Sequence, residues 1–201
     1  DNVVHEHLTY FSLLSLEPLL ARHNLEVFHV TLNDINGGSF RTLICHKGSR
    51  IIQPSVVSLR QAESLISLGN AKTYISWGER VKQIMKDLHD FVEGEVKKRK
   101  KIFLLGASTR GNTLLQAANL GSDLIVAASE RNEEKWGKKI ASMGIPIVSE
   151  EEARKAKPDY YLLLMWYFAS EICLREVEHL NQGSKFIIPL PELKIISKED
   201  L

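Results

Sequence analysis

The chain has 201 residues, of which 44% are hydrophobic and 25% are charged, and its formal net charge is +1. This composition is typical of a globular chain with one large domain or two small ones, and the near-neutral charge argues against nucleic acid or a membrane surface as a partner. Cys45 and Cys173 are the two cysteines, which excludes a disulfide framework and favours a reducing compartment. The sequence has neither an apolar run of about 18 residues nor a signal-peptide pattern, so we expect a cytoplasmic protein.

The first 47 residues predict a helix followed by two antiparallel strands. Ser12 or Ser15 can cap the helix, and Asn24 is a candidate for the left-handed residue that ends it. Strands are expected over 25–32 and 40–46, on either side of the turn "NDINGGS". The apolar face of the helix comprises Leu13, Leu16, Leu19 and Leu20. Such a unit lacks an opposing apolar layer, so we interpret it as the end of a larger domain.

Residues 50–100 predict two helices. Pro54 stands at the start of the first helix, "LGN" at 68–70 interrupts the pattern, and a second helix is expected over about 72–98. This helix ends in "KKRKK" at 97–101. Such a run can contact nucleic acid, but we favour a solvated helix end, because cations there complement the helix dipole and no aromatic residues interleave with them.

From residue 101 onward, apolar strand patterns alternate with helix patterns. The expected strands are 101–108, 123–130, 144–149, 159–166 and 184–190, the last of them stopped by Pro189 and Pro191. The expected helices are 110–121, 132–140, 150–156 (after a Ser149 cap) and 168–183. This alternation predicts an α/β domain with a Rossmann-like, doubly wound, mostly parallel sheet.

The stretch "LLGASTRGNTLLQ" joins a buried strand to a helix through a glycine-containing turn, where open α/β sheets bind ligands. The dinucleotide fingerprint would require glycine at Ser108. The phosphate-loop fingerprint fits Gly106, Gly111 and Thr113, but Asn112 stands in the place of its lysine. A nucleoside triphosphatase is therefore disfavoured.

The same turn still offers groups suited to a phosphate or diphosphate. Backbone N–H groups at a helix start bind anions, and Ser108, Thr109 and Arg110 add hydroxyl groups and a guanidinium. The alternative is a tight turn with a capped helix and no ligand. The candidate binding residues are Gly106, Ser108, Thr109, Arg110, Asn112 and Thr113.

Two further residues end predicted strands at the same edge. Glu130 stands where a Rossmann acid contacts a ribose, although it can equally belong to a capped helix start. Trp166 can stack on a base or sugar, although packing in the core explains it equally well. Glu192, in "IPLPELKII", can bind a ligand but more often such a residue is solvated.

The N-terminal "VVHEHLTYFS" contains His5, Glu6 and His7. A zinc site is disfavoured, because the spacing differs from H-E-x-x-H and no third ligand stands nearby. We expect no metal site. From the residue types alone, we interpret His5, Glu6 and His7 as polar side chains with a structural role.

The joint occurrence of several segments, in order, resembles a known family. "HEHLTYFSLLSLEPLLARHNLEVFHVTLNDINGGSFR" is similar to the closing third of class I S-adenosylmethionine-dependent methyltransferase domains. "GASTRGNTLLQ", "SERNEEKWGK", "GIPIVSEEEARKAKPDYYLLLMWYF" and "IPLPELKII" resemble the C-terminal domain of the sugar C-methyltransferases. The resemblance runs from about residue 3 to 196, and family members methylate C-3 of nucleotide-linked 4-keto-deoxysugars.

The resemblance implies an organisation and a set of cofactors. Family members carry an N-terminal zinc-binding module, a middle methyltransferase domain and a Rossmann-like C-terminal domain. Residues 1–49 would be the C-terminal part of the methyltransferase domain, 50–100 a helical linker and 101–201 the Rossmann-like domain. Neither a cysteine cluster nor a glycine-rich cofactor loop stands before residue 100. We therefore expect the zinc module to be absent, the S-adenosylmethionine site to lie mostly outside this chain, and the N-terminal half to be a missing partner.

The resemblance also implies site residues. His7 corresponds to the base that removes a proton beside the sugar ketone, with Glu6 as its neighbour; imidazole can do this near neutral pH. On the substrate side it places Tyr10, Asn36, Gly37 and Gly38. Asn36 stands where some members have histidine, and Tyr167-Phe168 replace more polar residues of some members.

The expected substrate is a nucleotide-diphosphate sugar, and a homo-oligomer is possible. One alternative is a non-catalytic α/β module that binds a nucleotide or nucleotide sugar. Another is an NAD-dependent oxidoreductase, which the missing G-x-G-x-x-G disfavours. By itself, this chain is expected to be inactive.

Overall fold

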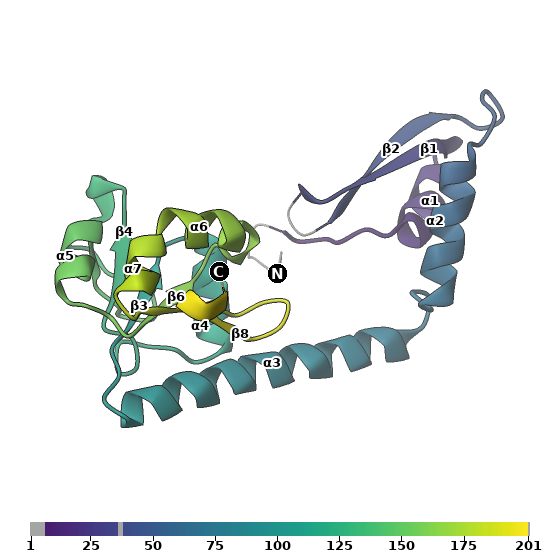
Figure 1. The fold of residues 1–201 in the computed structure, drawn as a ribbon. Helices are drawn as coiled ribbons and strands as arrows, with labels where there is room; N and C mark the ends of the chain where they lie inside the picture. The colour runs from purple at the N-terminus through teal and green to yellow at the C-terminus, as the bar shows by residue number, and fades with distance from the viewer. Residues whose placement is uncertain (1–6, 36–37, 201) are drawn as a thin grey trace. The chain divides into compact units, whose positions relative to one another are not determined.

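The structure is a computed structural model that describes residues 7–35 and 38–200. The backbone divides into two compact units, an N-terminal unit that ends at Arg80 and a C-terminal unit that begins at Val81. The boundary falls inside the long helix α3, Ala71–Lys97 (Figure 1). Each unit has its own hydrophobic core.

In the N-terminal unit, α1 (Leu13–Ala21) begins at the cap that the sequence predicts. The Ser12 side chain accepts a hydrogen bond from Ser15 N, and the Ser15 side chain accepts one from Ser12 N at 2.9 Å, so both candidate serines take part. Asn24 follows the helix with φ of 55°, the left-handed conformation expected of it.

The two predicted strands of this unit form an antiparallel hairpin, β1 (Leu25–Asn33) with β2 (Ser39–His46). A bulge between Val27 and His29 interrupts the pairing, so the buried residues Val27 and Val30 are three apart rather than two. Helix α2 (Pro54–Leu65) covers the hairpin. The core consists of Leu13, Val27, Val30 and Val56, with Leu16, Leu20, Phe40, Ile52 and Leu59 packed against it.

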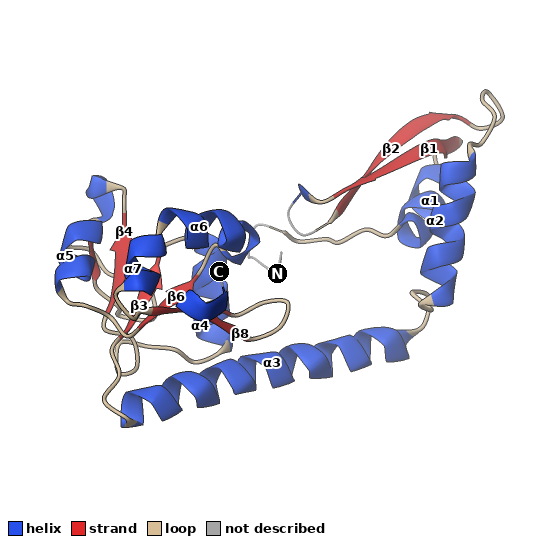
Figure 2. Ribbon diagram, viewed as in Figure 1, coloured by secondary structure: helices blue, strands red, loops and turns tan. Residues whose placement is uncertain are grey.

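The C-terminal unit contains a six-stranded sheet in the order β5-β4-β3-β6-β7-β8 (Figure 2). Neighbouring strands are parallel except that β8 is antiparallel to β7. The strands are β3 (Ile102–Leu105), β4 (Ala127–Glu130), β5 (Ile147–Ser149), β6 (Tyr160–Leu163), β7 (Lys185–Ile188) and β8 (Lys194–Ile196). The prediction of a Rossmann-like, mostly parallel sheet is confirmed.

Helices and short 3-10 turns connect these strands. They are α4 (Thr109–Ala117), η2 (Glu133–Lys135), α5 (Glu150–Lys155), η3 (Trp166–Phe168), α6 (Ala169–Arg175), α7 (Val177–Asn181) and η4 (Lys198–Asp200). From Val81 onward, α3 packs on the same core through Met85, Leu88 and Val92. At its end, Lys98 pairs with Glu95 at 2.7 Å and Lys100 pairs with Asp159 at 2.8 Å.

Three local expectations were wrong. The helix expected over 168–183 is divided into α6 and α7, because Glu176 has φ of −100° and ψ of 24° between them. Residues 132–140 contain only the 3-10 turn η2, since Trp136 is already extended. Pro189 does follow the end of β7, but the chain then returns as β8, so the sheet has a sixth strand.

Candidate functional site

The strand order places a topological switch point at the carboxyl ends of β3 and β6. The chain leaves β3 toward β4 and β5 on one side and crosses to β6 and β7 on the other. Loops at such a point diverge and leave a crevice in which open α/β sheets bind ligands. Two loops follow these strands here, Gly106–Ser108 after β3 and Leu164–Met165 after β6.

The loop after β3 has the conformation that its glycine allows. Gly106 has φ of 87°, and its N–H donates to Ser129 O in the neighbouring strand at 2.8 Å. Ser108 caps α4, because its hydroxyl accepts from Gly111 N at 3.0 Å. Gly111 lets α4 approach the end of β6: a Cβ at this position would lie 2.6 Å from Leu164 Cδ1.

A pocket of about 370 Å³ lies beside this loop. It brings together three of the predicted binding residues, Gly106, Ser108 and Glu130. Arg131, Lys135 and Arg175 supply three cations, against the two carboxylates of Glu130 and Glu150. The lining residues are Leu105, Gly106, Ala107, Ser108, Ser129, Glu130, Arg131, Lys135, Glu150, Met165 and Arg175. Arg175 is also paired with Glu176, outside the lining, at 2.7 Å, so the cations do not outnumber the carboxylates around them. The helix start and the three cationic side chains supply hydrogen-bond donors that suit a phosphate or diphosphate.

The carboxylate of Glu130 is held inside the protein. Its Oε2 accepts from Ala107 N at 3.0 Å and from Lys135 Nζ at 3.2 Å. Its Oε1 accepts from Arg131 N at 2.9 Å and from Asn132 N at 3.0 Å. Burial acts to raise the pKa of Glu130, but these hydrogen bonds outweigh it and lower the pKa below the usual value. The side chain is therefore a carboxylate at neutral pH.

Lys135 and Arg175 were missed by sequence reasoning. Lys135 Nζ donates to Ala107 O at 2.9 Å, so it lies directly on the glycine-containing loop. Arg175, at the end of α6, donates from Nε to Glu176 Oε1 at 2.7 Å. For Lys135, the available signal was its place five residues after Glu130. For Arg175 there was no local signal, because α6 comes near the loop only after the chain has returned from β5 to β6.

The other predicted residues at this edge, which are Thr109, Arg110, Asn112, Thr113 and Trp166, do not line the pocket. Arg110 Cζ lies 5.6 Å from the ring centre of Tyr167, and Tyr167 stacks on Trp166 with centroids 5.3 Å apart. Burial raises the pKa of Tyr167, while Arg110 acts in the opposite direction. Trp166 is 6% exposed, and its Nε1 and Asn112 Oδ1 are buried without a hydrogen-bond partner in the described part of the chain. Thr109 and Thr113 lie on α4.

The residues predicted in the N-terminal unit are only partly described. His7 and Tyr10 are exposed, with ring centroids 6.2 Å apart in an edge-to-face arrangement. Gly38 has φ of 122°, a conformation that favours glycine. Glu6, Asn36 and Gly37 lie outside the described residues.

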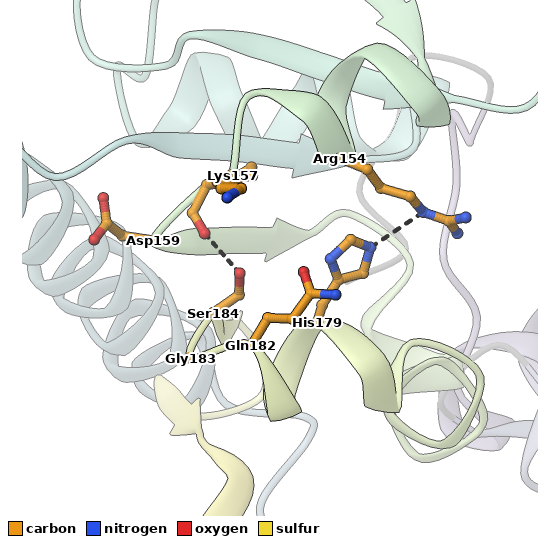
Figure 3. Close-up of a pocket in the computed structure, with 8 residues that line it drawn as sticks. Arg154, Lys157, Asp159, His179, Gln182, Gly183 and Ser184 are labelled. Carbon is orange, nitrogen blue, oxygen red and sulfur yellow. Dashed lines mark hydrogen bonds between the residues drawn. The ribbon is translucent and has the colours of Figure 1, made fainter.

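A larger pocket, of about 450 Å³, lies at the opposite edge of the sheet, before β6 and β7 (Figure 3). Arg154 Nε donates to His179 Nε2 at 3.3 Å, and Ser184 Oγ donates to Pro158 O at 2.6 Å. Arg154 and His179 stand near the C-terminal ends of α5 and α7, whose carbonyl groups favour cations. The positive charge of Arg154 therefore has a structural explanation, and the pocket lacks the helix start that the other edge offers to an anion.

The described residues also bear on metals and membranes. Within residues 7–35 and 38–200, no group of three or more histidine, cysteine or acidic side chains is arranged to hold a metal ion. In the same residues, none of the helices combines the length and the apolar character needed to cross a bilayer.

Comparisons with known proteins agree with this architecture. The family model for the C-methyltransferase C-terminal domain matches residues 34–191. The chain is also 36% identical over 200 residues to "C-methyltransferase NovU" of Streptomyces niveus. That alignment covers 99% of this chain and 48% of the relative, so the chain spans about half the length of this curated relative. The chain belongs to the C-methyltransferase C-terminal domain family.

Proposed function

We propose that this chain is the C-terminal portion of an S-adenosylmethionine-dependent C-methyltransferase that acts on a nucleotide-linked 4-keto-deoxysugar. The observation that carries the proposal is the 36% identity to a C-methyltransferase along 99% of the chain. The cation-rich pocket at the switch point supports it, because a nucleotide sugar carries a diphosphate.

In this proposal His7 is the base. A proton on the carbon next to a ketone is acidic because the anion left behind is an enolate. His7 takes this proton on a ring nitrogen, and the carbon then forms its bond to the methyl group. Glu6 would orient the ring or bind a sugar hydroxyl. Tyr10 lies beside His7, so it is placed to contact the same sugar.

S-adenosylmethionine, when bound, would supply the methyl group: the bond from the methyl group to the positively charged sulfur would break as the new carbon–carbon bond forms, and a neutral thioether would leave. The described residues of the N-terminal unit do not form a site for it by themselves. Their strand pair is antiparallel and joined by a turn, whereas a nucleoside cofactor is held by a loop between a parallel strand and a helix. We assign that site to the portion of the enzyme that this chain does not span, and zinc binding to the same portion. Cytoplasmic location, suggested by two unpaired cysteines, belongs to this proposal as well.

A non-catalytic module that binds a nucleotide sugar is the second candidate. The pocket favours it, because all its lining residues belong to the C-terminal unit, without any contribution from His7. Calorimetric titration of the chain with dTDP, GDP, CDP and UDP tests the nucleotide site in both candidates. Binding of none of them would remove the support that the pocket gives to a nucleotide substrate.

A chimera separates the two candidates. The aligned portion of the Streptomyces niveus relative is replaced by this chain, and two reactions of a 4-keto sugar nucleotide are measured. One is methyl transfer, and the other is exchange of the proton beside the ketone in D2O, which needs the base but no methyl donor. His7→Ala and His7→Gln should each slow both reactions by about 10²-fold or more. His23→Ala, at an exposed histidine of the same unit, is the control. Full exchange activity in His7→Ala would refute His7 as the base.

A further inference from the structure

Glu130 ends β4, the second strand of the parallel series. In dinucleotide-binding sheets, an acid at this place accepts hydrogen bonds from the ribose and thereby reads its 2′-hydroxyl. That role requires a carboxylate oxygen with a free acceptor position directed at the ligand.

The acceptor positions of Glu130 are already used. An ionised carboxylate has about four acceptor positions, two on each oxygen. Ala107 N and Lys135 Nζ occupy Oε2, at 3.0 and 3.2 Å. Arg131 N and Asn132 N occupy Oε1, at 2.9 and 3.0 Å. The side chain is only 14% exposed, so water or a ligand has little access to it.

The same contacts fix the loop. Glu130 binds the N–H of Ala107, and Lys135 Nζ binds the carbonyl oxygen of Ala107 at 2.9 Å. The Glu130–Lys135 ion pair therefore holds both the N–H and the carbonyl group of Ala107. Trp136 Nε1 donates to Glu130 O at 2.8 Å, which ties the segment after β4 to the same point.

We propose that Glu130 is a positioning residue, which together with Lys135 holds the Gly106–Ser108 loop in its ligand-binding shape and does not read the ribose 2′-hydroxyl. This inference rests on the proposed binding of a nucleotide sugar. It follows that a ribonucleotide and its 2′-deoxy analogue depend on Glu130 equally.

The test is calorimetric titration of the full chain with UDP and with dUDP. Glu130→Gln replaces an acceptor oxygen by a donor amide, so it should weaken the binding of both nucleotides by roughly tenfold, with their ratio unchanged. Glu151→Gln is the matched control, because Glu151 is an exposed acid paired with Lys155 and lies outside the pocket. A loss of UDP binding with dUDP binding intact would overturn the proposal, as would unchanged binding of both.

A second measurement reports on the conformation of the Gly106–Ser108 loop. In a ¹H–¹⁵N spectrum, the Ala107 amide should lie downfield in the unliganded wild type, because it donates to a carboxylate, and should move upfield in Glu130→Gln. Lys135→Met should shift the same amide and weaken both nucleotides, with Lys155→Met as its control. An unchanged chemical shift of the Ala107 amide in these variants would refute the proposal that Glu130 and Lys135 hold the loop. If the wild type binds neither nucleotide, the proposed nucleotide site fails, and this amide still decides whether Glu130 holds the loop.

Discussion

The carboxylate of Glu63, in α2, accepts a hydrogen bond of 2.7 Å from the backbone N–H of Leu13, the first residue of α1. Its second oxygen accepts one of 2.7 Å from Leu14 N. Ser15 N donates to the hydroxyl of Ser12, and Ser12 N donates to the hydroxyl of Ser15, so all four N–H groups that a helix start leaves open are satisfied. Glu63 is 7% exposed and anchors α1 to α2.

Glu63→Ala should therefore destabilise the N-terminal unit by about 2 kcal/mol, because one buried and one partly buried N–H donor lose their carboxylate acceptor. Native-state hydrogen exchange at Leu13 and Leu14 is the direct measurement, since both amides should exchange faster. Glu17→Gln is the control: it breaks the more exposed pair with Arg60 and should cost at most about 1 kcal/mol. Unchanged protection of both amides in Glu63→Ala would contradict this account.

Gly111→Ala should destabilise the C-terminal unit. The added Cβ would lie 2.6 Å from Leu164 Cδ1 and 2.8 Å from Leu164 Cβ, and Leu164 is 2% exposed. We expect a net loss of about 1–3 kcal/mol, measured by thermal unfolding, although alanine by itself favours the helix. Gly94→Ala in α3 meets no atom within 4 Å and should instead stabilise by about 0.5–1 kcal/mol. A rise in Tm for both variants would show that α4 can move away from β6.

Glu176 should make the protein sensitive to acid. Hydrogen bonds from His179 and Arg175 lower the pKa of Glu176 from 4.5 to about 2, against the opposing effect of burial. Because the folded pKa lies below the unfolded value, this stability is fully present above about pH 4.5 and is lost as the pH falls toward 2.

The contribution of Glu176 is roughly 3–4 kcal/mol at most, at about 1.4 kcal/mol for each pKa unit. Denaturant unfolding between pH 7 and pH 3 should show a shallower decline in Glu176→Gln than in the wild type. Other carboxylates also titrate in this range, so the informative quantity is the difference between the two curves. Parallel curves would mean that Glu176 is not the source of the acid sensitivity.

Arg110 does not line the pocket but stands on α4 two residues after Ser108, which does. We expect it to pair with the second phosphate of a nucleoside diphosphate bound there, so Arg110→Ala should weaken binding by about 1–3 kcal/mol. Arg110→Lys keeps the charge but loses the planar fork, so it should restore only part of the affinity. Tyr167→Phe keeps the ring on which Arg110 lies but loses the hydroxyl that hydrogen-bonds to Arg110, so it should weaken binding less than Arg110→Ala does. Wild-type affinity in Arg110→Ala would place the phosphate elsewhere, toward Lys135 and Arg175.

Much of the architecture could be predicted from local patterns. The buried runs "IFLL" and "YYLL" indicate central parallel strands, and Ser12 and Ser149 cap helices as predicted. Asn24 has the predicted left-handed conformation, but α1 ends earlier, at Ala21. The sixth strand could not be predicted, because "KII" is too short to stand out and pairs only because the chain turns back on β7. The break at Glu176 was hidden for a similar reason, since its carboxylate also bonds to Arg154, which lies in α5 and far from it in the sequence.

The sequence by itself determined the order of strands and helices along the chain and the glycine-containing turn after the first parallel strand, because periodicity and turn chemistry are local properties. It also carried the resemblance to sugar C-methyltransferases. Only the tertiary structure decided which side chains share the pocket. Arg175 and Lys135 lie beside the loop of Gly106 because the elements that carry them pack next to it in the folded chain. The carboxylate of Glu130 points into the protein because it accepts hydrogen bonds from four donors in two segments. Such convergence depends on the register between elements far apart in the chain, which no single segment encodes.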